Sequence, residues 1–405
     1  MNIVSTEAPA VERPVSWIAI GSLAMGAFAL VTSEFLPVGL LPQIAADLHI
    51  TTGQAGLMVT MPGFLAAAAA PLSIVFAGHI DRRRVLATLL VLLVASNLVV
   101  ATAAGITQLL LGRILLGVAV GSFWTIAGSL GPRLKPGPDG IRASALILSG
   151  VSIGTVAGVP AGALIGSLLG WRAAFFGGAL FAGVAIVTLL SLLPAIPAVR
   201  GSGLADIPSI LRRRTSRIGL AAAVLIFVGQ FAAYTYVAPF LKAYPGIEGG
   251  ALSILLLANG AAGFLGNMAG GWLSARNPQR ATLVMSAILG GSVLTLALTG
   301  ASPVMAWAMV IVWGFGFGML PIAMQSLLFA TAPDRIEGMQ ALFTTVAQAA
   351  IGAGALLGGV IADHVGIVGA LLTGAVAALG TGGLILVTAP TRTAKETRQL
   401  CEAGS

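Results

Sequence analysis

The chain has 405 residues, of which 57% are hydrophobic and only 8% charged, and its mean hydropathy is +1.00. Soluble domains carry about 25% charged residues, so this composition excludes a protein whose surface faces water. The formal charge of +8 does not indicate nucleic-acid binding, because the basic residues lie between long apolar stretches. Since the segments do not alternate in polarity as in a β-barrel, the sequence predicts an all-α membrane protein.

Twelve apolar stretches are long enough to cross the hydrocarbon core, which takes about 20 residues of helix. Residues 1–16 precede them, have no small-residue cleavage pattern, and are interpreted as a cytoplasmic tail. The one cysteine, Cys401, lies in a polar C-terminal tail, so no intrachain disulfide is expected. The predicted helices are 16–41, 53–78, 85–104, 107–130, 141–169, 172–193, 218–242, 249–274, 281–300, 303–330, 338–363 and 367–387.

The positions of the basic residues predict the orientation. Eighteen of the 21 Lys and Arg fall on the side of the N-terminus when the chain crosses twelve times, so both termini are predicted to be cytoplasmic. The longest polar stretch, 196–217, is a predicted cytoplasmic linker between two six-helix halves, 1–195 and 218–405. Its basic run, 212–214, is interpreted as a positive-inside anchor, with a lipid-headgroup site as the alternative.

The two halves contain similar segments. Residues 161–166 (Ala-Gly-Ala-Leu-Ile-Gly) match 353–358 (Ala-Gly-Ala-Leu-Leu-Gly), and the loop 78–82 occupies the place that 272–276 holds in the second half. Both pairings join equivalent helices about 190 residues apart. Two such halves, related by an axis along the membrane normal, are a transporter architecture in which substrate binds between the halves near mid-membrane.

Several motifs resemble those of the major facilitator superfamily, and the resemblance covers nearly the whole chain. Residues 78–84 (Gly-His-Ile-Asp-Arg-Arg-Arg) are similar to its signature after the second helix, although Ala77 replaces the first glycine and a later glycine is missing. Residues 113–117 (Arg-Ile-Leu-Leu-Gly) resemble its Arg-x-x-x-Gly motif. Residues 154–166 resemble the antiporter motif of the drug:proton antiporter group, with an additional valine before the proline. Residues 32–42 and 229–241 are similar to bacterial efflux proteins for sugars, purine ribonucleosides and chloramphenicol-type drugs.

This resemblance implies a secondary transporter of the bacterial inner membrane, acting as a monomer, that exports a small organic solute in exchange for protons by alternating access. A uniporter or proton symporter for a small nutrient is an alternative, and so is a transport-inactive receptor or scaffold. ATP is not expected to drive transport, because the sequence has no Gly-x-x-x-x-Gly-Lys loop. The three histidines do not form a metal set, no nucleophile–base pair is apparent, and neither cofactor nor enzyme activity is expected.

Two charged residues fall well inside predicted spans, away from the span ends, where a charge costs roughly 3 kcal/mol or more and suggests function. Glu34 is the only such carboxylate and is the candidate proton carrier. The alternative is a residue near the external end that reaches water, because Pro37 and Pro42 predict that the helix ends soon after it. Arg113 is the only such cation and is expected to line a water-filled cavity near Glu34 or an anionic group, coupling proton and substrate. The alternative for Arg113 is a structural bond to helix-end carbonyls.

The resemblance also assigns a gate and an antiporter motif. The gate is a cytoplasmic latch whose charges pair across the two halves; a plain exposed turn is the alternative. Its residues are Asp81, Arg82, Arg83 and Arg84. The antiporter motif predicts a smooth packing face with a proline kink, to which the resemblance adds a role in setting antiport over symport. Its residues are Gly154, Gly158, Pro160, Gly162 and Gly166.

Uncharged polar and aromatic residues within the spans are the candidate substrate contacts, and they suit neutral, hydroxylated or heterocyclic solutes. Hydrogen bonding and packing between helices are the competing explanation for each of them. The candidates are Trp124, Gln230, Tyr234, Trp313, Gln325 and Gln348.

Overall fold

The computed structural model describes residues 15–76, 80–127, 130–135, 138–197 and 207–388. Residues 1–14 of the predicted N-terminal tail, the start of the 78–84 motif, residues 198–206 of the linker and the C-terminal tail with Cys401 lie outside these residues. Twelve helices or continuous helical stretches in the described part are long and apolar enough to cross a membrane. The prediction of an all-α fold with twelve membrane-spanning helices is therefore confirmed.

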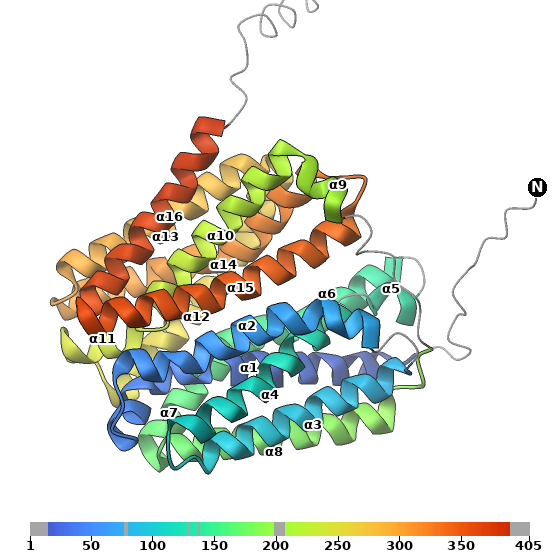
Figure 1. Ribbon diagram of the computed structural model, residues 1–405, viewed down its shortest axis with the longest axis horizontal. Helices are drawn as coiled ribbons and strands as arrows, with labels where there is room; N and C mark the ends of the chain where they lie inside the picture. Colours follow the sequence, from blue (N-terminus) through green and yellow to red (C-terminus); the bar gives the residue numbers. More distant parts are fainter. Residues whose placement is uncertain (1–14, 77–79, 128–129, 136–137, 198–206, 389–405) are drawn as a thin grey trace, which may run out of the picture.

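The helices form two bundles, drawn in Figure 1 as a blue-to-green group and a group that runs from light green through yellow to red. The first bundle comprises α1 (Trp17–Asp47), α2 (Thr52–Phe76), α3 (Arg82–Ala101), α4 (Ile106–Ala127), α5 (Gly131–Leu134), α6 (Pro138–Ile153), the π-helical turn η1 (Gly154–Gly158), α7 (Val159–Leu169) and α8 (Trp171–Leu192). The short helix α9 (Ile207–Arg212) leads into the second bundle. This comprises α10 (Arg214–Tyr234), α11 (Val237–Ala243), α12 (Gly249–Arg276), α13 (Pro278–Thr299), α14 (Pro303–Thr331), α15 (Ile336–His364) and α16 (Ile367–Thr388).

The bundles meet along a seam formed mainly by α2 and α15, with further contacts between α1 and α11 and between α7 and α12. Small residues let the helices approach closely at this seam. A methyl group added at Gly63 of α2 would lie 2.7 Å from the backbone nitrogen of Gly352 in α15, so the two backbones are in direct contact there.

The first helix continues past Pro37 and Pro42 to Asp47, so the expectation that it closes soon after Glu34 is wrong. Each proline removes one backbone N–H, but membrane helices tolerate this where other groups satisfy the freed carbonyl. The predicted fifth helix contains η1, which ends two residues before Pro160, and the predicted seventh helix breaks between α10 and α11.

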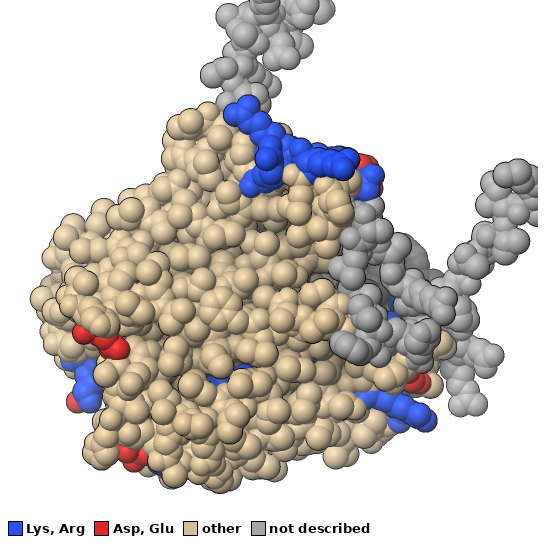
Figure 2. Space-filling model, viewed as in Figure 1, with Lys and Arg blue, Asp and Glu red and all other residues tan. Residues whose placement is uncertain are grey.

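The charged residues gather at the ends of the molecule. Figure 2 shows Lys and Arg concentrated at the end where α9 and α10 begin, with acidic groups at the opposite end. We call the first the arginine-rich end. There Arg213 donates to both carboxylate oxygens of Asp334 at 2.6 Å, and these hydrogen bonds lower the pKa of the Asp334 carboxyl to about 2. This asymmetry is the one used to predict the orientation, which stays a prediction.

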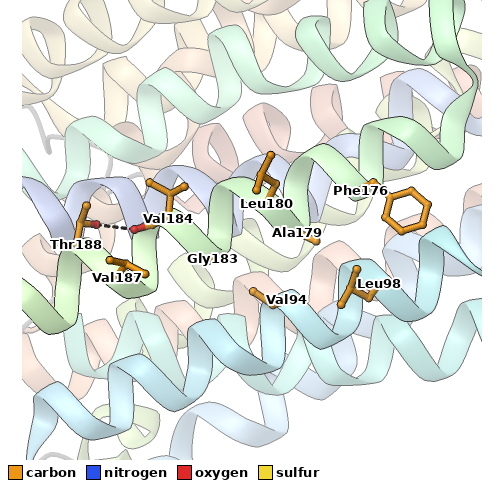
Figure 3. A pocket seen from close by; sticks show the side chains of 9 residues that line it. All are labelled: Val94, Leu98, Phe176, Ala179, Leu180, Gly183, Val184, Val187 and Thr188. Carbon is orange, nitrogen blue, oxygen red and sulfur yellow. Dashed lines mark hydrogen bonds between the residues drawn. The ribbon is translucent and has the colours of Figure 1, made fainter.

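The outer surface carries an apolar groove between α3 and α8, shown in Figure 3. Leu180 and Val187 are among its lining residues and are well exposed. The only hydroxyl in the groove belongs to Thr188, which donates to the carbonyl of Val184 at 3.0 Å. A lining without unpaired polar side chains suits lipid chains.

Candidate transport site

Arg113 lies in α4 and is completely buried, with 0% of its surface exposed. Its three donor groups all reach backbone carbonyls of neighbouring helices. Nε donates to Met58 at 2.6 Å, Nη1 to Ser33 at 2.8 Å, and Nη2 to Glu34 at 2.8 Å. The expectation that Arg113 lines a water-filled cavity is therefore wrong, because its side chain has no contact with solvent.

Two of these carbonyls are free because of prolines. In an α-helix the N–H of each residue bonds the carbonyl four residues earlier. Pro37 has no N–H for the carbonyl of Ser33, and Pro62 has none for that of Met58. The guanidinium therefore replaces one missing helical bond in α1 and one in α2. Of the two sequence interpretations, the structural one describes the contacts, although the carbonyls are in mid-helix and not at helix ends.

Glu34 is the only buried carboxylate among the residues whose burial the structure describes, with 5% of its surface exposed. It lies near the middle of α1, and its Oε1 accepts a hydrogen bond from Nε2 of Gln348 at 3.4 Å. Gln348 belongs to α15, so this contact joins the two bundles. Because Glu34 is buried in mid-helix, the alternative that it reaches water from a helix end is wrong.

An aromatic cluster lies beside Glu34. Phe35 stacks on Phe231 of α10 with ring centres 5.6 Å apart, and Phe231 contacts Phe317 and Tyr234 edge-on. Tyr234 in turn meets Trp313 edge-on at 5.9 Å. The stacking of Phe35 on Phe231 is a second contact between the bundles, next to that of Glu34, and the other rings of the cluster belong to the second bundle.

One amide completes this cluster. Nε1 of Trp313 donates to Oε1 of Gln230 at 2.8 Å. Three predicted substrate contacts, Gln230, Tyr234 and Trp313, are thus brought together. The Nε2 of Gln230 is buried and has no hydrogen-bond partner within the described part of the chain. A buried donor without a partner costs about 1–3 kcal/mol, so this amide is an unsatisfied polar group in the middle of the cluster.

The remaining substrate candidates lie elsewhere. Gln325 donates to Gln340 at 2.6 Å, and Gln340 donates to Thr344 at 3.2 Å. Since Gln340, Thr344 and Gln348 are spaced by four residues, they share one face of α15. Trp124 packs edge-on against Phe123 in the core of the first bundle, and no described contact joins it to the cluster.

The predicted gate makes local contacts in this conformation. The carboxylate of Asp81 accepts from the backbone N–H of Arg83 at 2.7 Å and of Ile196 at 3.3 Å. Arg83 donates to the carbonyl of Leu190 in α8. These contacts fasten the start of α3 to the end of the first bundle, and the described contacts of Asp81 and Arg83 include none to the second bundle. The latch across the halves stays a prediction for another conformation; Arg82 and Arg84 flank Arg83 at the same helix start.

The glycines of the antiporter motif pack against α1, as expected of a smooth face. A methyl group at Gly158 would lie 2.2 Å from the Thr32 hydroxyl, and one at Gly162 would lie 1.9 Å from Leu36. Gly154 meets Val31 and Gly166 meets Leu40 in the same way. The motif therefore contacts α1 on both sides of Glu34.

Sequence reasoning missed one group at the seam. Asp363 is the last residue of a predicted helix and was not among the predicted site residues, but its carboxylate contacts α2 across the seam. The only signal in the sequence is an acidic residue at the end of a glycine-rich helix, which is too common to identify a contact.

Two helical bundles that meet at a buried carboxylate define a multi-pass membrane transporter. The sequence model of the Major Facilitator Superfamily matches residues 23–355, and the chain belongs to that family.

Solved structures of several transporters share the fold. A mutant of the peptide transporter POT superimposes with a TM-score of 0.75 at 13% identity, covering 92% of this chain and 94% of that one. A mutant of the nucleoside transporter NupG gives 0.70 at 16%, covering 91% and 96%. A bacterial homologue of the human lysosomal transporter Spinster, inward-facing and unoccupied, gives 0.69 at 16%, covering 93% and 96%. At these identities the likeness concerns the fold alone.

Proposed function

We propose that this transporter exports a small organic solute across the bacterial inner membrane in exchange for protons, by alternating access. The observation that carries the proposal is the contact between Glu34 and Gln348. Glu34, the one carboxylate that is buried within the described part of the chain, lies at the meeting point of the two bundles, and in this proposal their relative movement alternates access. The protonation of a carboxylate at that point depends on how the two bundles are arranged, and it affects that arrangement in turn.

Gln348 suits a partner that gains and loses a proton. Its Nε2 donates to Glu34, while its Oε1 is buried without a hydrogen-bond partner among the described groups. An amide offers donors and an acceptor, a carboxylate only accepts, and a protonated carboxyl also donates. Rotation of the amide therefore gives either form of Glu34 a partner on α15, so α15 responds to the protonation of Glu34.

Arg113 acts in this proposal as a positioning residue. Its bonds to the carbonyls of Ser33 and Glu34 fix the backbone from which the carboxylate extends. Because the same guanidinium also holds α2 through Met58, α1 and α2 move as one unit around Glu34.

The aromatic cluster supports a solute with a flat ring and hydrogen-bonding groups. Phe231, Tyr234 and Trp313 offer ring faces and edges, and Gln230 offers a free amide donor. Neutral heterocyclic or hydroxylated molecules, such as nucleosides and chloramphenicol-type drugs, fit these groups. The polar face of α15 that includes Gln340 and Thr344 supports a hydrated route from Glu34 toward the arginine-rich end.

The test uses purified protein in liposomes with an imposed pH gradient and a panel of nucleosides, sugars and antibiotics. We expect one class of solute to move uphill against protons, and a protonophore to abolish this movement. Solute flux that does not depend on the pH gradient would instead establish a uniporter. Solute flux in the same direction as the protons would establish a symporter. A protein that binds a solute but never moves it would be a receptor.

A further inference from the structure

At the end of the seam opposite the arginine-rich end, a side chain from the second bundle caps a helix of the first. The carboxylate of Asp363, in the last turn of α15, accepts from the Thr51 hydroxyl at 2.6 Å. Its other oxygen accepts from the backbone N–H of Gly53 at 2.9 Å. Thr51 and Gly53 lie at the N-terminus of α2, so one carboxylate joins the two bundles twice.

The N-terminus of α2 is suited to such a partner. The first N–H groups of a helix have no acceptor within the helix and carry a partial positive charge. Thr51 and Gln54 satisfy some of them through a capping box, in which the Thr51 hydroxyl accepts from the Gln54 N–H and the Gln54 side chain accepts from the Thr51 N–H, both at 3.0 Å. The N–H of Gly53 and the hydroxyl of Thr51 donate their hydrogen bonds to the carboxylate of Asp363.

The residues around this contact are closely packed, so α2 and α15 cannot separate here without breaking these hydrogen bonds. A methyl group at Gly53 would lie 2.4 Å from the Asp363 carboxylate and 2.6 Å from the carbonyl of Gly359. Tyr236 packs into the seam next to this contact. Its hydroxyl donates to the carbonyl of Ala355 at 2.8 Å and lies against Gly56 of α2. The contact thus belongs to a closed end of the seam.

Two ion pairs at this end contrast with the hydrogen bonds of Asp363. Arg172 pairs with Asp47 at 2.5 Å within the first bundle, and Lys242 pairs with Glu248 at 3.1 Å within the second. Separation of the bundles leaves both pairs intact, whereas it breaks both hydrogen bonds of Asp363. Asp363 therefore opposes opening of this end specifically.

We infer that Asp363 is a positioning residue of the transport cycle, which holds α2 against α15 while this end is shut and releases it when the end opens. The inference rests on the alternating access of the proposed function and not on the identity of the solute or on protons. In the predicted orientation the closed end is external, so loss of Asp363 shifts the protein toward the outward-open conformation.

The test measures the distance between the bundles directly. With Cys401→Ser as background, cysteines at Ala104 and Ala301 receive spin labels, because both alanines are exposed in turns that follow α3 and α13. Pulsed electron resonance then gives the distance distribution in liposomes. We expect Asp363→Ala to increase the population of long distances roughly 25-fold, because it loses two hydrogen bonds that each contribute roughly a factor of five. Thr51→Val should give a smaller change in the same direction.

Controls separate a gate from general damage. Glu248→Ala removes an exposed carboxylate at the same end that pairs within one bundle, and it should leave the distribution unchanged. Asp363→Asn, which keeps an acceptor for the Gly53 N–H, should lie between wild type and Asp363→Ala. If Asp363→Ala does not fold, Thr51→Val still decides the question. An unchanged distribution in the folded variants overturns the inference, and because no solute or pH gradient is used, this result is independent of whether antiport is found.

Discussion

Arg113 and Pro37 are complementary: Arg113 donates to the one carbonyl of α1, that of Ser33, which Pro37 leaves without its helical N–H. The same guanidinium serves the carbonyl of Met58, which Pro62 frees in α2. A single buried cation thus allows prolines in two neighbouring helices. Since Glu34 directly follows Ser33, this arrangement also sets the position of the candidate proton carrier.

From these bonds we predict that Arg113→Ala lowers stability as well as transport. The substitution leaves the carbonyls of Ser33 and Met58 without a donor, and each such group costs about 1–3 kcal/mol. Arg113→Lys keeps a cation but loses the planar fork, so it should retain an intermediate stability and a fraction of transport. Thermal unfolding of the purified protein in detergent measures the first effect. An Arg113→Ala variant that melts like wild type would show that water or other groups satisfy these carbonyls.

A second prediction concerns the partner of Glu34. Gln348→Leu removes both the donor and the free acceptor next to the carboxylate, so transport should lose much of its dependence on the pH gradient while the protein stays folded. Gln325→Leu is a matched control in the same bundle, because Gln325 bonds Gln340 and not Glu34. Flux in liposomes at several imposed gradients measures the effect. Equal loss of coupling in both variants would argue against a specific role for Gln348.

The third prediction follows from the contacts of the antiporter motif. A methyl group at Gly158 meets three atoms of Thr32, a β-branched side chain with few alternative rotamers, whereas one at Gly162 meets the flexible end of Leu36. Gly158→Ala should therefore destabilise the protein by about 1–3 kcal/mol, and Gly162→Ala by less. Gly177→Ala has open space around it and should be neutral. Thermal unfolding of the three variants gives the order, and a neutral Gly158→Ala would contradict the observed packing.

The sequence predicted the fold because apolar length and glycine content report directly on the membrane environment. It also predicted the packing face of Gly158 and Gly162, since their spacing is local. The partners of Arg113 could not be read in the same way, because they depend on which helices lie beside α4. Pro37 was interpreted as a stop signal, although a distant arginine satisfies the carbonyl it frees. Asp363 was missed because its partner Thr51 lies 312 residues away.

A fourth prediction addresses the orientation, which rests on the distribution of basic residues. Reporter fusions at Lys135 and Arg214 should be cytoplasmic, and a fusion at Gly246 should be external. Lys135 lies between α5 and α6, and Arg214 begins α10, whereas Gly246 lies between α11 and α12 at the other end. A cytoplasmic signal at Gly246 would contradict the twelve-span topology.

The last prediction is that Glu34 is the coupling carboxylate. An antiporter must prevent proton and solute from occupying the carrier together, and one titratable group at the meeting point of the bundles is sufficient for this. Deprotonated Glu34 would favour the solute-bound state, and protonation from outside would expel the solute and neutralise the group for the return. Glu34→Gln keeps the size of the side chain and its amide can still face Gln348, so the fold should persist while the proton is no longer exchanged.

Glu34→Gln should therefore lose uphill efflux driven by pH but retain solute binding or downhill exchange, and Glu34→Asp should keep part of both activities. Glu248→Gln, which alters an exposed carboxylate outside the seam, should behave like wild type. Solute and proton flux are recorded together in liposomes with an imposed pH gradient, so that the coupling ratio is measured directly. If Glu34→Gln still exchanges protons for solute at the wild-type ratio, the coupling site lies elsewhere. Since the described residues of known burial include no second buried carboxylate, that result would also remove the main support for proton antiport.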